Sequence, residues 1–169
     1  MPFGTTIGQA IEEEKKFEAE RKRKEDEEAA LKKKLQEERA AAAEKISKAV
    51  TVTLIEKGRQ FKNYDPGRFD DRQIFRIGVK NTSDKALEGV SGRLVFVDIF
   101  DKEVGSVGFK ISETIKPGQD YVWVGSRRYN EFDDEQRAVW NLENDKFKTR
   151  FEPGTVVFTD GTKLVADAN

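Results

Sequence analysis

The sequence contains no cysteine and no histidine. The lack of cysteine excludes disulfide bonds, thiolate nucleophiles and sulfur ligands for metals. The lack of histidine removes the usual general base and the commonest metal ligand. The glycine-rich phosphate-binding loop, the dinucleotide fingerprint and the nucleophile elbow are also missing. We therefore expect a chain that is not an enzyme, has no catalytic residues and binds no cofactor.

Acidic clusters are the remaining candidates for chemistry. They follow no calcium-loop pattern, although carboxylates in loops can bind Ca²⁺. We interpret them as solubilising loop charge and expect no metal site; whether any loop binds Ca²⁺ stays open. The clusters are Asp65, Asp70 and Asp71; Asp98, Asp101 and Glu103; and Asp133, Asp134 and Glu135.

Long apolar runs are missing too. No stretch approaches the roughly 20 apolar residues that span a bilayer, so we expect no membrane-spanning helix. The first residues, "MPFGTTIGQA", are too short and too polar for a signal peptide. Two expectations stay open: a cytoplasmic protein, or an envelope protein in which Met1 replaces a removed signal segment. A lipid anchor is compatible only with the second.

Charge is abundant but balanced and unevenly placed. Charged residues make up 37% of the 169 residues, and the net charge is only -1. This balance disfavours nucleic acid as a partner. Aromatic residues before residue 50 are limited to Phe3 and Phe17. We therefore predict two regions, a charged region over residues 1–49 and a globular domain over residues 50–169.

The first region has the composition of a helix. Thr6 and Gln9 form a capping-box pattern, and the residues after them are mainly Ala, Glu, Lys, Arg and Leu, which are good helix formers. Oppositely charged residues recur four positions apart, and each such pair stabilises a helix by about 0.2–0.5 kcal/mol. The eight pairs are Glu12–Lys16, Glu18–Lys22, Glu20–Lys24, Glu28–Lys32, Arg21–Glu25, Arg23–Glu27, Lys33–Glu37 and Lys34–Glu38.

Three states remain open for this region: a single charged helix that acts as a rod, a weak coiled coil, or disorder in solution. Apolar residues occur at both ends, but the stretch from Glu18 to Glu28 has only alanine at 19. Stable coiled coils need several continuous heptads. We therefore favour the rod and keep self-association through the helix as the alternative.

The second region predicts an antiparallel β-sandwich. "QIFRIGVKN" alternates, with Phe75, Ile77 and Val79 on one face, and further strands are expected in "GRLVFVDIF", "DKEVGSVGFKI" and "DYVWVGS". Turn residues separate these runs, including "KPGQ" and the hairpin signal Asp160-Gly161. No helices alternate with the strands, which excludes βαβ units. The expected fold class is α+β, a long N-terminal helix followed by an immunoglobulin-like sandwich.

One insertion interrupts the strands. "YNEFDDEQRAVWNLEN", residues 129–144, predicts a short helix capped by Asn130, with Phe132, Val139, Trp140 and Leu142 facing inward. The simplest interpretation is a plug at one end of the sandwich. The alternative is a partner-binding surface, because Trp, Tyr and Arg dominate binding hot spots. Its candidate residues are Arg127, Arg128, Tyr129 and Trp140.

The run from Arg76 to Gln119 carries a pattern of turns: a strand into "VKNTSDKAL", an alternating strand into "FDKEVGS", and "KPGQ" before the next strand. In this pattern the chain resembles bacterial FxLYD-type immunoglobulin-like envelope domains. The charged helix before the domain is similar to the tether of bacterial lipoproteins. The resemblance implies a non-enzymatic envelope module that binds a protein partner or builds structure. The alternative is a cytoplasmic or phage-type assembly subunit that packs through its helix.

Overall fold

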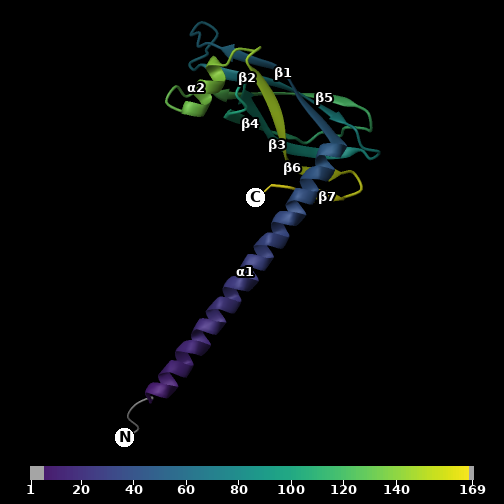
Figure 1. Ribbon diagram of the computed structural model, residues 1–169. Coiled ribbons are helices and arrows are strands. Elements are labelled where there is room, and N and C mark those ends of the chain that lie inside the picture. The colour runs from purple at the N-terminus through teal and green to yellow at the C-terminus, as the bar shows by residue number, and fades with distance from the viewer. Residues whose placement is uncertain (1–5, 168–169) are drawn as a thin grey trace. The chain divides into compact units, whose positions relative to one another are not determined.

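The computed structural model describes residues 6–167 (Figure 1). It contains a long N-terminal helix, seven strands in antiparallel sheets and one short helix, which confirms the predicted α+β fold class. In chain order the elements are α1 (Ile7–Ala49), β1 (Val50–Gln60), β2 (Arg72–Asn81), β3 (Leu87–Asp98), β4 (Glu103–Ile111), β5 (Asp120–Arg128), α2 (Asp134–Asn141), β6 (Phe147–Phe158) and β7 (Lys163–Val165).

Helix α1 begins at the predicted capping box. The Thr6 backbone N–H donates to Gln9 Oε1 at 3.0 Å, and the Gln9 N–H donates to Thr6 Oγ1 at 3.4 Å. These reciprocal bonds satisfy backbone donors that a helix start leaves free. Three of the predicted charge pairs lie within 4 Å, namely Arg21–Glu25, Arg23–Glu27 and Glu20–Lys24. Within residues 6–167, no helix has the length and apolar character needed to cross a membrane.

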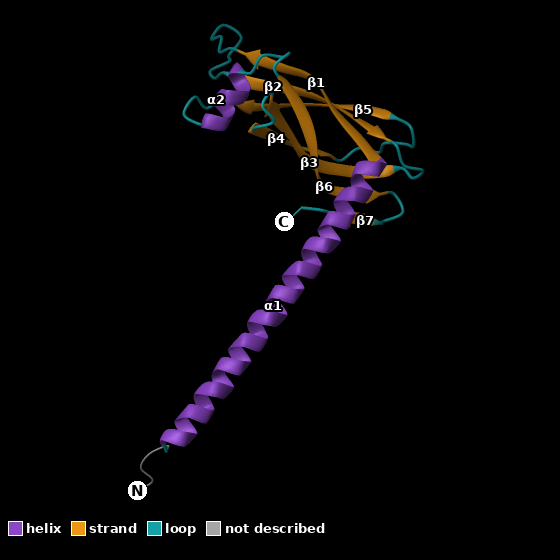
Figure 2. Cartoon of the chain, viewed as in Figure 1, coloured by secondary structure: helices purple, strands orange, loops and turns teal. Residues whose placement is uncertain are grey.

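Two sheets form the sandwich (Figure 2). One has the strand order β1-β2-β5 and the other β4-β3-β6-β7. The predicted inward residues Phe75, Ile77 and Val79 of β2 are buried, because alternate side chains of a strand share one face. They pack with residues of the opposite sheet such as Leu94 and Phe96 in one hydrophobic core. The Asp160-Gly161 turn joins β6 to β7, with Gly161 at φ 87°.

The last turns of α1 belong to the sandwich. The chain divides into two compact units between Arg39 and Ala40. Ile46 has no exposed surface and lies in the core cluster. The Thr82 N–H donates to Ala49 O, and Thr82 Oγ1 donates to Lys48 O, each at 2.9 Å. Thr82 thereby donates hydrogen bonds to two carbonyls at the C-terminus of α1, where a helix leaves its last carbonyls without partners inside the helix.

Helix α2 forms as predicted, but it starts later than expected. Its N-cap is Asp133, whose carboxylate accepts the Gln136 N–H at 2.9 Å. The expectation of Asn130 as the cap was wrong, because the Asn130 side chain instead accepts the Phe132 N–H in a local turn. Phe132 was also expected to face inward and is 86% exposed. Val139 is fully buried, as predicted.

Removing residues 1–39 will leave the stability of the sandwich unchanged within about 0.5 kcal/mol. Every side chain from Thr6 to Glu38 is exposed, and exposed positions contribute little to stability. Thermal unfolding of the truncated and full-length chains, followed by circular dichroism in the β-sheet region, measures the difference. A loss above about 2 kcal/mol would show that the N-terminal unit packs on the sandwich.

Candidate functional site

Three loops meet at one end of the sandwich. The β1–β2 loop (residues 61–71) and the end of β5 are neighbours, because Arg72 pairs with both Gln60 and Arg128. Helix α2 lies there too, since the Gln73 side chain donates to Gln136 O at 2.7 Å. The β3–β4 loop (99–102) adjoins the start of β6. We call residues 61–71, 99–102 and 129–146 the loop end; Figure 1 shows α2 there.

The loop end exposes large apolar side chains from all three loops. Their exposed fractions run from 61% to 86%. Exposed apolar groups that gather in one region mark interaction surfaces, whereas single exposed ones are ordinary. Loops held by a rigid sheet are also where binding residues concentrate. The side chains are Phe61, Tyr64, Phe69, Ile99, Phe100 and Phe132.

The loop end is also acidic. It contains ten acidic and five basic residues, which gives -5, whereas the whole chain carries only -1. An open depression of about 590 Å³ borders it, lined in part by Arg59, Phe61, Asn63 and Arg68. Apolar side chains on loops with a net negative charge favour a partner surface that combines apolar and basic residues.

Trp140 supports this surface from beneath. Tyr129 stacks on its indole with ring centroids 4.2 Å apart, and Phe61 meets it edge to face at 5.6 Å. The Arg59 guanidinium lies 5.4 Å from the ring centroid, a cation–π distance. Trp140 is itself only 8% exposed. The structure therefore gives this candidate residue a supporting position, with half-buried Tyr129 beside it.

Arg127, another candidate binding residue, is tied into the sandwich. Its Nε donates to Gln73 Oε1 at 2.5 Å and its Nη1 to Ser106 O at 2.9 Å, which links β5 to β2 and β4. The guanidinium lies over the Phe75 ring at 5.4 Å. Burial lowers the pKa of Arg127, and the carboxylates of Asp133 and Glu135 oppose this shift. These contacts make Arg127 a clamp between the sheets.

Replacing Arg127 with alanine will destabilise the domain by roughly 1–3 kcal/mol, because it leaves buried acceptors on Gln73 and Ser106 without donors. Arg128→Ala is the matched control, since the Arg128 side chain is 79% exposed. We expect it to change stability by less than about 0.5 kcal/mol. Urea unfolding of dilute protein measures both. Equal, small losses would contradict the clamp.

Arg128 is thus the most exposed of the candidate residues. Its nearest carboxylate is Asp70, 3.9 Å from Nε. The four candidate residues predicted from the sequence lie in one region of the structure, but they differ in how far they are exposed. Arg128 is exposed, Arg127 and Tyr129 are half-buried, and Trp140 is buried. Sequence reasoning missed the exposed rings of Phe61, Tyr64 and Phe69, whose loop joins the insertion only in the folded chain.

The acidic clusters have local structural partners. Asp71 accepts the Lys62 N–H at 2.7 Å. Asp98 accepts the N–H groups of Phe100 and Lys102, each at 2.9 Å, which shapes the β3–β4 turn. Within residues 6–167, no group of three or more acidic, histidine or cysteine side chains could hold a metal ion.

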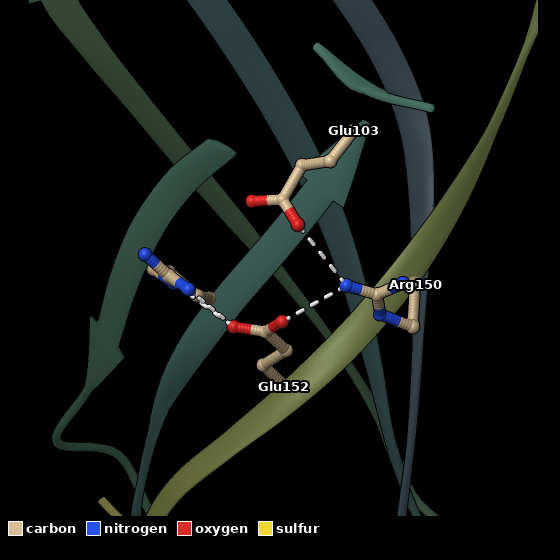
Figure 3. Close-up of polar contacts among 4 residues, drawn as sticks. Glu103, Arg150 and Glu152 are labelled. Atoms are coloured by element: carbon tan, nitrogen blue, oxygen red, sulfur yellow. Dashed lines mark hydrogen bonds and ion pairs between the residues drawn. The ribbon is translucent and has the colours of Figure 1, made fainter. Parts of the chain in front are cut away.

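A second polar cluster lies on the outer face of the four-stranded sheet (Figure 3). Arg150 bridges Glu103 at 3.2 Å and Glu152 at 3.1 Å, and Arg93 donates to Glu152 at 2.5 Å. Val95 shares this face with Arg93 and is fully buried. Because Val95 pairs with Arg150 in the register, we infer that the long charged side chains cover it. The cluster is therefore structural.

Acidic pH will remove the contribution of the Glu152 ion pairs to the stability of the fold. The Arg93 hydrogen bond lowers the pKa of Glu152 below its ordinary 4.5, with help from Arg150 and against the effect of burial. A lowered folded-state pKa stabilises the fold above the unfolded value and loses that effect as pH falls. The stability difference between wild type and Glu152→Gln should therefore be full at pH 7 and shrink below about pH 4.5. Urea unfolding across pH measures it; a constant difference would contradict the ion pair.

Comparisons with known proteins identify no family. No family model and no curated protein matches the chain. A Northeast Structural Genomics Consortium target of known X-ray structure is 14% identical, with 68% of this chain and 78% of the other covered and a TM-score of 0.32. Another such target, from Bordetella pertussis and described as a putative ApaA protein, is 13% identical over 68% and 83% of the two chains, with a TM-score of 0.35. At these TM-scores the likeness carries no argument about function.

Proposed function

We propose that the chain is a non-enzymatic binding module whose sandwich captures a protein partner at the loop end. The observation that carries this proposal is the six large apolar side chains exposed together on three loops. Burying such side chains stabilises a complex by about 25 cal/mol per Å² of apolar surface. The partner surface that fits best is apolar with basic residues around it, because the loop end carries -5, from ten acidic and five basic residues.

The scaffold beneath these loops supports a binding role. Arg127 fixes β5 to β4 through the 2.9 Å bond to Ser106 O. Val139 of α2 packs against Gly105 so closely that an added Cβ there would come within 2.7 Å of it. A surface held in place before binding loses little conformational freedom in the complex, which favours affinity.

The experiment that tests the proposal compares two double variants in affinity capture from a lysate. Phe69→Ser with Phe132→Ser removes apolar surface from the loop end. Ile11→Ser with Phe17→Ser removes comparable surface from α1, where both side chains are also exposed. We expect the first variant to lose the partner and the second to keep it. Equal capture by the first variant and wild type would overturn the proposal.

The second candidate function is an assembly subunit that packs through α1. It is favoured by five large apolar side chains that α1 exposes: Ile7, Ile11, Phe17, Leu31 and Leu35. In that case Ile11→Ser with Phe17→Ser should remove the self-association that depends on α1 and so lower the mass measured by light scattering. In the binding-module proposal, α1 instead holds the sandwich at a distance as a tether, and the same variant keeps the mass of the wild type.

As part of the proposal we place the module in the bacterial cell envelope, supported by the resemblance of residues 76–119 to envelope immunoglobulin-like domains. The alternative is the cytoplasm. Fractionation of cells that express the complete native gene tests this point. Recovery with the envelope or periplasm is the expected result, and recovery in the cytoplasm alone would overturn the location without affecting the loop end.

A further inference from the structure

Strand β5 has an open edge. It pairs with β2 alone and lies at the border of the three-stranded sheet. The Tyr129 N–H donates to Asp71 O, and Gln119 O accepts the Asn81 N–H, so odd-numbered residues turn their backbone groups toward β2. Antiparallel pairing alternates along a strand. The even-numbered residues of β5 therefore point their N–H and C=O groups away from β2.

The central six residues of this edge lack the features that keep strand edges from pairing. Such features are charged residues, prolines, bulges and short length. The segment from Tyr121 to Ser126 has no charge and no proline, and its register with β2 has no bulge. The other edge strands in residues 6–167 each have one of these features. Strand β1 has a bulge between Leu54 and Glu56, the pairing of β4 with β3 has a bulge at Phe96/Val97, and β7 is only three residues long.

The same edge exposes apolar side chains. Val122 and Val124 are 44% and 62% exposed on the outer face of the sheet. Ile55 lies beside them, since a Cβ at Gly78, the register partner of Val122, would meet Ile55 Cδ1 at 3.2 Å. An added strand would satisfy the free backbone groups, and its own outer-face side chains would pack beside Val122 and Val124.

The sequence of β5 is complementary to itself. In an antiparallel pair of two copies centred on Val124, Asp120 of each copy faces Arg128 of the other. Val122 then faces Ser126, and Trp123 faces Gly125. Opposite charges directly across a pair of strands are stabilising. Shifting the register by two residues in either direction separates Asp120 from Arg128, so the charges select this alignment.

We propose that two copies of the chain associate through β5, paired antiparallel about a two-fold axis at Val124. The two three-stranded sheets then form one continuous sheet of both copies. This isologous arrangement is closed, so it gives a dimer and no filament. It is independent of the loop-end proposal, because the residues at its centre lie on the sheet edge and outside the three loops.

Cysteine cross-linking of the full chain tests the axis, since the chain has no cysteine of its own. Opposed residues in a hydrogen-bonded pair have Cα atoms about 5.5 Å apart, within the range of a disulfide. Val124→Cys should therefore form a cross-linked dimer under mild oxidation. Val122→Cys should not, because the two substituted positions lie about four residues of strand, or roughly 13 Å, apart across the axis. An equimolar mixture of Val122→Cys and Ser126→Cys should cross-link.

A charge exchange tests the register without cysteine. Asp120→Arg places like charges opposite Arg128 at both ends of the pair, and should raise the dimer Kd roughly tenfold. Adding Arg128→Asp should restore the wild-type Kd. Sedimentation equilibrium measures all three proteins, with circular dichroism to show that each is folded. A monomeric wild type, or equal cross-linking of Val122→Cys and Val124→Cys, would overturn the proposal.

Discussion

Ile46→Ala is expected to lower the free energy of unfolding of the sandwich by about 2–5 kcal/mol. Ile46 is a residue of the charged helix, yet it has no exposed surface and packs in the core with residues of both sheets. Truncation to alanine removes buried methyl and methylene groups and leaves a cavity that close-packed neighbours fill only in part.

Ile11→Ala is the matched control for this prediction. It changes the same residue type in the same helix, but Ile11 is 46% exposed, so we expect a change within about 0.5 kcal/mol. Chemical unfolding followed by tryptophan fluorescence reports on the sandwich, because Trp123 and Trp140 both lie in it. If Ile46→Ala cost no more than Ile11→Ala, the last turn of α1 would not be part of the core.

Asn81→Ala is expected to cost roughly 3 kcal/mol or more, because Asn81 is fully buried and its side chain makes four hydrogen bonds. Nδ2 donates to Lys85 O at 2.8 Å and to Ile115 O at 2.9 Å. Oδ1 accepts the backbone N–H of Ser83 at 3.0 Å and its hydroxyl at 2.7 Å. The side chain thus joins the β2–β3 turn to the β4–β5 loop, and alanine leaves buried carbonyls unpaired.

The control for Asn81 is Asn130→Ala. The Asn130 side chain accepts the Phe132 N–H at 3.0 Å in an exposed turn. Water replaces such a bond at little cost, so the expected change is within about 0.5 kcal/mol. Thermal unfolding measures both variants. Equal effects would contradict the claim that the hydrogen bonds of Asn81 join the β2–β3 turn to the β4–β5 loop.

Local patterns predicted most of the fold. The capping box at Thr6 and Gln9 formed because it needs only neighbouring residues. The alternation of Phe75, Ile77 and Val79 predicted the inner face of β2. The cap of α2 was missed although the sequence carried a signal for it. Three residues after Asp133 comes Gln136, whereas three residues after Asn130 comes Asp133. A carboxylate cap followed by Gln at that spacing is a capping-box arrangement, which the pattern around Asn130 lacks.

The candidate site was harder to predict, because it depends on which loops meet. Alternation along β5 places Arg127 on the same face as Trp123, which signals the inner side of the sheet. Its partners Gln73 and Ser106 come from other strands, and strand order cannot be inferred from spacing. For the same reason the sequence indicated the insertion at 129–144 but not its neighbours Phe61 and Phe69.

Site-specific photo-crosslinking in cells tests most directly whether the loop end is the binding surface. A photoreactive phenylalanine analogue replaces Phe132, Phe69 or Phe17, one at a time. All three are phenylalanines of similar exposure, 86%, 72% and 69%, but only the first two lie at the loop end. The account predicts one cross-linked partner shared by positions 132 and 69 and none from position 17. Adducts from position 17 alone would contradict it.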